Sequence, residues 1–283
     1  MAPRKRGRMM QEYEEDLNAL LATQNLNGEA YWSTSDGGIA KGVPFSTLEA
    51  GMMLAELGYN KQNIEIQEIA NLIFGNIKED GRIKVYSSGT IYPCQTAGAA
   101  RALCYMGYAD DQRLKATYSY FLKTQQADGG WRCNASKFGN GPETKYSNPG
   151  PTLTILDVFR FTKLINKNDQ IDNAVEFLLR HWETKIPLGP CHYGIGTLFM
   201  KIEFPMVRYN ILHYVHTLSF YDKAKKDPRF LAALATITDK LINGKVIVES
   251  TNRKLYNYAF CKVHEPNEIA TSYYHQIVDN LKK

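Results

Sequence analysis

Hydrophobic residues recur along the chain in helix-length segments of two kinds. Segments of the first kind begin at or near a proline and carry apolar or small side chains on every face. They are Pro44 to Leu57, Pro93 to Met106, Pro151 to Leu164 and Pro205 to Phe220. A helix that is apolar all round is expected to be buried, and proline suits the first helical turn because that position needs no backbone N–H. The pattern therefore predicts four buried, inner helices.

Segments of the second kind have one apolar face and one polar face. They are Gln11 to Thr23, Ile66 to Ile77, Leu114 to Gln126, Ile171 to His181 and Phe230 to Ile242. Most are followed at once by a glycine-containing loop, whereas the loop after His181 is longer and carries two prolines. The apolar faces at helical spacing indicate helices with one solvated side. We therefore expect these segments to form outer helices, with Asn267 to Lys282 as a fifth inner one.

The two kinds of segment alternate, and the alternation repeats about every 50 to 60 residues. About five helical hairpins with an inner and an outer radius can close into an α/α barrel. An open α-solenoid of the TPR or HEAT kind is the alternative arrangement of the same hairpins. Strand content should be low, with short extended pieces near Ile83 to Tyr86 and Lys245 to Glu249. The predicted fold class is all-α.

One stretch, from Leu114 to Cys133, combines an amphipathic helix with a tight loop that ends on a tryptophan. Asp128-Gly129-Gly130 breaks the helix, and Trp131 can then fold back on the helix end while Gln125 or Gln126 caps backbone groups. The stretch resembles the QW motif of squalene and terpene cyclases and the related loops of protein prenyltransferase β subunits. This resemblance covers the whole chain in outline, matches at motif level over residues 92 to 133, and implies a closed α/α toroid.

Composition and charge indicate where the folded domain begins and in which compartment the protein is expected. The net charge of +5 owes much to Arg4, Lys5, Arg6 and Arg8, which we interpret as a basic disordered tail over residues 1–10 rather than a nucleic-acid-binding arm. Residues 11–283 then form a single toroid domain. The five cysteines are odd in number and scattered along the chain, so they do not form the disulfide framework of a secreted protein. No apolar h-region follows the basic start, so we expect no signal peptide. No apolar run approaches the roughly 20 residues that span a bilayer, and we expect a cytoplasmic protein.

The cavity inside such a barrel is the expected site, because the starts of the inner helices meet at one end of it and present unpaired N–H groups. Proteins of the resembled superfamily hold an isoprenoid chain in this bowl. The side chains expected to contact a ligand are Tyr92, Gln95, Tyr146, His192, Tyr193, Arg208 and His213. His213 and His216 lie three residues apart, on one side of their helix. Hydrogen-bonded core histidines are the alternative interpretation of that pair.

A zinc site is a second expectation, because Cys94 in the sequence YPCQTAG resembles the helix start where prenyltransferase β subunits place their zinc-binding cysteine. This chain departs from the family at both other ligands, since Tyr92 replaces the aspartate and residues 148–152 lack the histidine. A different set, Cys94, Cys133, Cys191 and His192, would supply the thiolates and imidazole of a tetrahedral Zn²⁺ site. Simple packing of small cysteines is the alternative.

These features leave two functions in view. The first is a prenyltransferase-like or terpene-cyclase-like protein that binds a hydrophobic, isoprenoid or lipid-like ligand, with zinc held by the cysteines. The second is a non-catalytic binding or scaffold module that keeps the toroid without the chemistry, a view favoured by the absence of the DxDD acid motif and of the full zinc triad. The sequence names no protein partner and does not decide whether the protein is an enzyme.

Overall fold

The computed structural model describes residues 10–133 and 141–283, so the predicted tail at residues 1–10 lies outside them except for Met10. All regular structure in these ranges is helical, and strand-like pairing is limited to isolated bridges such as Ile77 with Ile83 and Ile242 with Lys245. The prediction of an all-α fold with little strand is confirmed. None of the helices in the described ranges is long and apolar enough to cross a bilayer.

Backbone contacts divide the chain into two compact units. Unit 1 contains the residues up to Ile91, Gln95–Tyr120 and Asn252–Phe260, and unit 2 contains Tyr92–Cys94, Phe121–Thr251 and Cys261–Lys283. The expectation of one domain over residues 11–283 stays a prediction.

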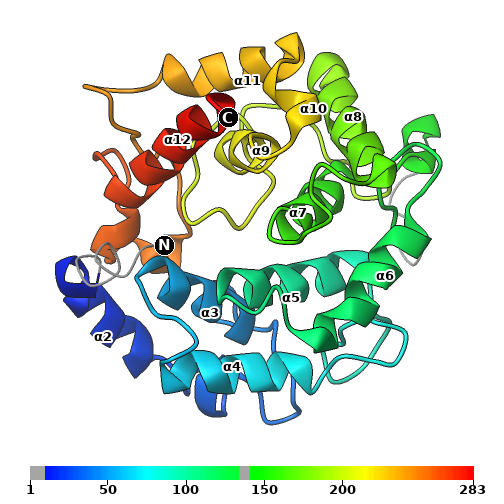
Figure 1. The fold of residues 1–283 in the computed structure, drawn as a ribbon. Helices are drawn as coiled ribbons and strands as arrows, with labels where there is room; N and C mark the ends of the chain where they lie inside the picture. The colour runs from blue at the N-terminus through cyan, green and yellow to red at the C-terminus, as the bar shows by residue number, and fades with distance from the viewer. Residues whose placement is uncertain (1–9, 134–140) are drawn as a thin grey trace. The chain divides into compact units, whose positions relative to one another are not determined.

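Unit 1 is built from helical hairpins whose buried faces follow the sequence pattern. Its main helices are α2 (Glu14–Ala22), α3 (Thr47–Glu56), α4 (Ile64–Phe74) and most of α5 (Pro93–Tyr105), with the first residues of α6 (Lys115–Thr124). Helices α3 and α4 pack side by side (Figure 1). Ser46 caps the start of α3, since its Oγ accepts from the backbone N–H of Glu49 and its hydroxyl donates to the Glu49 side chain.

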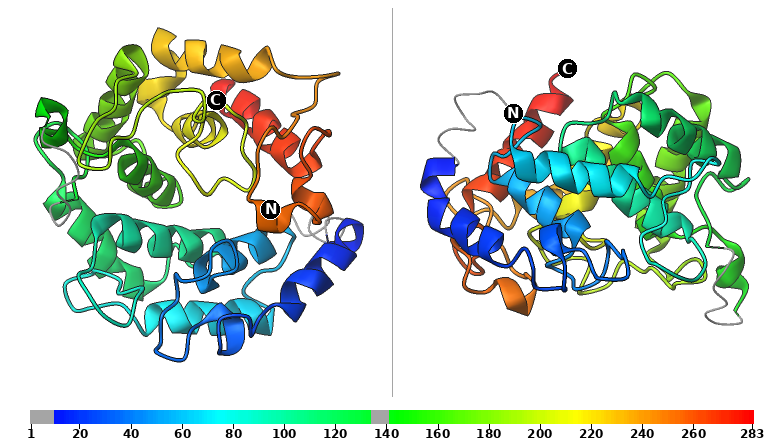
Figure 2. Two further views of the ribbon diagram at one scale, coloured as in Figure 1. Left: turned by 180° about the vertical axis from the view of Figure 1, so that it is seen from behind. Right: turned by 90° about the horizontal axis from the view of Figure 1, so that it is seen from below.

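Unit 2 has an inner and an outer layer of helices. The inner helices are α7 (Pro149–Phe159), α9 (Ile211–Leu218) and α12 (Glu268–Leu281), and the outer ones are α8 (Asp169–Thr184), α10 (Asp222–Lys225) and α11 (Pro228–Thr238). Helix α9 packs against α7, α11 and α12, while α8 covers α7 and contacts α10 and α11 (Figures 1 and 2).

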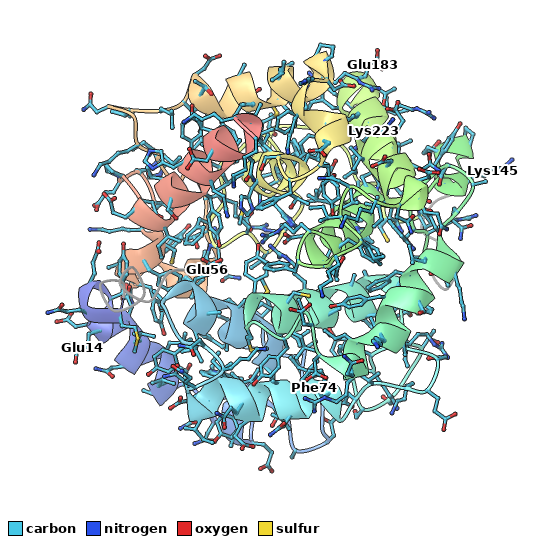
Figure 3. The ribbon with its side chains drawn as sticks, in the orientation of Figure 1. Glu14, Glu56, Phe74, Lys145, Glu183 and Lys223 are labelled. Atoms are coloured by element: carbon cyan, nitrogen blue, oxygen red, sulfur yellow. The ribbon has the colours of Figure 1, made fainter. Side chains whose placement is uncertain are left out.

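Burial in unit 2 separates the two layers as the sequence predicted. Every residue of α9 and nearly every residue of α7 is buried, whereas α11 buries only Phe230, Ala233 and Ile237. Figure 3 shows Lys145 and Glu183 projecting from the outer edge of this unit. The predicted contrast therefore holds between the inner helices α7 and α9 and the outer helix α11. The inner helix α12 is the exception, because it buries only five of its 14 residues.

The start of α9 differs from the sequence prediction. Residues 205–210 are not helical, and the helix begins at Ile211, after Asn210, whose Oδ1 accepts from the backbone N–H of His213. A proline does begin a helix at Pro93, and at Pro149 rather than Pro151. Three of the six residues that do not join the helix, Val207, Arg208 and Tyr209, line a cavity.

The loop after α6 has the predicted construction. Trp131 folds back on the helix, with its Nε1 donating to the Phe121 carbonyl at 2.8 Å, and Gln125 Nε2 donates to the Gly129 and Gln170 carbonyls at 2.6 Å. Gly129 has φ of +95°, and a Cβ there would lie 2.4 Å from the Asn173 carbonyl oxygen. Only glycine adopts this φ without strain and has no Cβ to clash with the carbonyl. The loop therefore packs directly on the backbone of α8.

Candidate ligand-binding cavity in unit 2

A cavity of about 480 Å³ opens among residues that all belong to unit 2. Its wall comes from three places in the chain: the first turns of α7, the connection from His192 to Tyr209, and His213 on α9. Cys94 and Ser250 complete it. The long loop between α8 and α9 therefore closes over the N-terminal ends of two inner helices, which is the position the sequence predicted for a site.

Three aromatic rings line one part of the cavity, which we call the floor: Phe199 is buried, and Tyr193 and Tyr209 are half-buried. The ring centroids of Phe199 and Tyr209 lie 4.7 Å apart, and Tyr193 meets Tyr209 edge-on at 5.8 Å. Tyr193 packs so closely on the start of α7 that a Cβ at Gly150 would lie 2.4 Å from its ring. Burial, together with the nearby Cys191, Cys94 and Cys133, raises the pKa of Tyr193 to about 12. Tyr193 therefore stays an uncharged phenol.

A second part of the lining, which we call the rim, is mixed in character and mostly exposed, although Glu203 in it is buried. Leu198 is 74% exposed and Val207 is 38% exposed, which is unusual for residues bordering a cavity. Lys201, Glu203 and Arg208 supply the charge, and Arg208 Nε donates to Glu203 Oε1 at 3.0 Å. Burial raises the pKa of Glu203, while Arg208 opposes that rise. The rim thus combines apolar surface with cationic groups.

His213 is held by a buried carboxylate. Its Nε2 lies 3.2 Å from Asp157 Oδ2, and Asp157 also pairs with Arg160 one helical turn further along α7. The Asp157 side chain is fully buried, and the side chains of His213 and Arg160 are 2% and 7% exposed. Because a carboxylate only accepts hydrogen bonds, His213 must donate its Nε2–H to Asp157. In the neutral ring, Nδ1 is then the acceptor nitrogen.

Tyr209 is held in a similar way by His181 on α8. His181 Nε2 lies 2.9 Å from the Ile186 carbonyl and Nδ1 lies 2.8 Å from the Tyr209 hydroxyl. A carbonyl oxygen cannot donate, so Nε2 carries the proton and Nδ1 accepts from Tyr209. Burial lowers the pKa of His181, which keeps the ring neutral at pH 7. The Tyr209 hydroxyl therefore donates its hydrogen bond to His181.

Three of the four predicted zinc ligands lie near one side chain. Cys94, Cys133 and Cys191 are all close enough to the Tyr193 hydroxyl to help raise its pKa. His192 is exposed, with φ of +51°. Across residues 10–133 and 141–283, no group of three or more His, Cys, Asp or Glu side chains has an arrangement that could hold a metal ion. The zinc site stays a prediction.

Comparisons with known proteins were made at the levels of sequence and of structure. No protein-family model and none of the curated proteins matches the chain. Among solved structures, the chain is similar to the type II terpene cyclase MstE from Scytonema, with 14% identity and a TM-score of 0.48 over 95% of this chain and 74% of the cyclase. A complex of that cyclase with its product, merosterolic acid A, gives 13% identity and a TM-score of 0.48 over 99% and 78%.

The structure brings together some of the residues predicted to bind a ligand and leaves others apart. His192, Tyr193, Arg208 and His213 all line the cavity. Tyr146 lies outside the lining with half of its surface exposed, Tyr92 is also outside it, and Gln95 belongs to unit 1. Ligand contact by each of these residues remains a prediction, but four of them share one site.

Several residues of the site escaped the sequence analysis. Asp157 and Arg160 are charged residues inside the otherwise apolar segment TLTILDVFRF, and a buried ion pair spaced for one helical turn was the available signal. Leu198, Phe199 and Tyr209 lie in the connection before α9. Tyr209 was not predicted to contact a ligand, since the sequence pattern predicted a helix over residues 205–210. The loop geometry that aims these side chains has no periodic signature.

Proposed function

We propose that the protein binds a hydrophobic, isoprenoid-like or lipid-like molecule in the cavity of unit 2. The observation that carries the proposal is that the exposed apolar side chains Leu198 and Val207 line the same cavity as the aromatic rings of the floor. Isolated exposed apolar residues are common on protein surfaces. Here they border a concave site, where an apolar ligand would cover them.

Size and energetics agree with such a ligand. The volume of about 480 Å³ falls within the range of roughly 300 to 1,000 Å³ that is usual for small-molecule sites. Covering a largely exposed leucine stabilises a complex by up to about 1.5 to 3 kcal/mol, because apolar surface leaves water. Phe199 and Tyr209 add flat apolar area without a further cost in ordering, since their rings already pack together.

Binding, rather than cyclisation, is what the residues support. The chain has no DxDD motif, and a carboxylic acid that protonates an alkene must be made unusually strong by its neighbours. At the cavity, Glu203 has a raised pKa, which makes it a weaker acid. The proposal therefore assigns the cavity a ligand and no carbocation chemistry.

A direct binding assay tests this proposal. The purified full chain is titrated with the neutral fluorescent probe N-phenyl-1-naphthylamine, and farnesol is then used to displace it. We expect saturable binding that Leu198→Glu weakens at least about tenfold, because a charged group at the rim resists desolvation.

Leu231→Glu is the matched control. Leu231 is also an exposed leucine of unit 2, at 42%, but it lies on α11 and does not line the cavity. The control should bind the probe like the unchanged protein. Absence of binding, or equal loss in both variants, would overturn the proposal, provided that circular dichroism shows both variants folded.

A further inference from the structure

We infer that the ligand is an alcohol or a phenol, whose hydroxyl donates a hydrogen bond to the inner part of the cavity. This inference rests on the proposed function, since it names the chemical class of the molecule bound there. The inference follows from the hydrogen bonds of the polar side chains in the lining. Some of these groups can donate to a ligand, whereas others already donate to a protein acceptor.

Three lining residues give their protons to protein acceptors. The Tyr209 hydroxyl donates to His181 Nδ1 at 2.8 Å, His213 Nε2 donates to Asp157 at 3.2 Å, and the Thr154 hydroxyl donates to the Gly150 carbonyl at 3.1 Å. The direction of each bond is fixed, because the partner is an acceptor or, for His181, a nitrogen whose opposite neighbour is a carbonyl. These donors are not available to a ligand.

Two of these residues keep acceptor capacity. A hydroxyl oxygen that has donated its proton retains lone pairs, so Tyr209 Oη and Thr154 Oγ1 act toward a ligand as acceptors. The two residues come from separate places, the loop before α9 and α7, and both line one cavity. Acceptor oxygens therefore face the ligand from two parts of the lining.

The other polar side chains of the lining are compatible with a hydroxyl as well, since a hydroxyl can both donate and accept: His192, Tyr193, Lys201, Glu203, Arg208 and Ser250. The Tyr193 phenol can donate to a ligand oxygen, and the cations Lys201 and Arg208 lie at the rim. An alcohol can accept from Tyr193 and donate to Tyr209 or Thr154 at the same time. An ether, ester or ketone can only accept, so it would face the acceptors lone pair to lone pair. Sites that expect a donor reject analogues without one, since buried polar groups are then left without a partner.

The test compares farnesol with farnesyl methyl ether, which keeps the chain and the oxygen but lacks the O–H. We expect farnesol to bind about tenfold more tightly, as one hydrogen bond in a partly buried site would produce. Tyr209→Phe should reduce that preference several-fold. Thr154→Val, a nearly isosteric change at a second acceptor, provides an independent variant if Tyr209→Phe fails to fold.

Tyr214→Phe is the matched control for loss of a phenol. The Tyr214 hydroxyl donates to the Leu178 carbonyl at 3.0 Å, and Tyr214 does not line the cavity, so its removal should leave the preference for farnesol unchanged. Equal binding of alcohol and ether, or a preference that neither Tyr209→Phe nor Thr154→Val reduces, overturns the inference while leaving the proposed function intact. Binding of neither compound would instead count against the proposed function.

Discussion

Asp157 of α7 and His213 of α9 lie 56 residues apart in the sequence, yet their side chains meet at 3.2 Å inside unit 2. Arg160 completes the group, so one carboxylate serves a cation and a cavity-lining imidazole. A buried charge is tolerated only when it is paired and hydrogen-bonded. The contact therefore ties the orientation of a cavity residue to the packing of two inner helices.

Replacing Asp157 by Asn should strongly destabilise the protein. Arg160 would keep its charge in the interior without a carboxylate partner, and breaking a buried pair in this way costs roughly 3 to 5 kcal/mol. The free energy of unfolding from urea denaturation measures the effect. Asp222→Asn is the control, because Asp222 is 69% exposed in its pair with Lys225 and surface pairs contribute about 1 kcal/mol at most. Similar losses in the two variants would contradict the assignment.

Gly129→Ala should destabilise the protein more than Gly244→Ala. Both glycines have positive φ, +95° and +75°, so both substitutions carry a backbone cost of roughly 1 to 2 kcal/mol. Only Gly129 packs against backbone, at the Asn173 carbonyl, whereas a Cβ at Gly244 would meet nothing within 4 Å. Thermal denaturation of the two variants measures the difference. An equal fall in melting temperature would show that the loop does not press on α8 as described.

His216 should make the protein less stable in acid. Burial, the largest cause, and the nearby Arg160 lower the pKa of this histidine to about 3, below its unfolded value of 6.5. The unfolded chain then binds the extra proton between these values, so the stabilisation is complete above pH 6.5 and is lost as the pH falls toward 3.

The slope attributable to His216 approaches 1.4 kcal/mol per pH unit in that window. It is measured as the free energy of unfolding between pH 4 and 7 for the unchanged protein and for His216→Gln. The variant should show a shallower dependence on pH, because its amide does not titrate. Parallel curves would show that His216 is not held neutral in the folded state.

Glu49 in unit 1 should act in the opposite direction. Burial raises the pKa of its carboxyl to about 7, above its ordinary value of 4.5, while Arg101 opposes that rise. The protonated form is favoured in the fold, so this contribution to stability is complete below pH 4.5 and is lost as the pH rises through 7. Glu49→Gln should therefore be more stable, relative to the unchanged protein, at pH 8 than at pH 5. An unchanged difference between the two pH values would refute the raised pKa.

Much of the helical framework could be predicted from the sequence, because burial and periodicity are linked directly. Helix α9 has an apolar sequence and is buried along its whole length, whereas α11 has one apolar face and is buried at three positions. The Trp131 loop was also predictable, since the tryptophan and glycines act within a short stretch. The range of α9 was wrong at its start, because the apolar residues before Asn210 read as one continuous helix.

The candidate site was predictable only in part, since its key relationships are tertiary. His213 could be placed on an inner helix, but its pairing with Asp157 depends on how α7 and α9 pack. Tyr209 donates to Nδ1 of His181 because the Ile186 carbonyl accepts from the other ring nitrogen, and that contact depends on the turn after α8. No spacing in the sequence encodes these contacts.

The central claim is that an apolar ligand occupies the cavity of unit 2, and hydrogen–deuterium exchange with and without saturating farnesol tests it most directly. The account predicts slower exchange in peptides covering residues 192–213 and the start of α7, with little change in α11. Binding of farnesol that leaves exchange in residues 192–213 unaltered, or that protects another region instead, would contradict it.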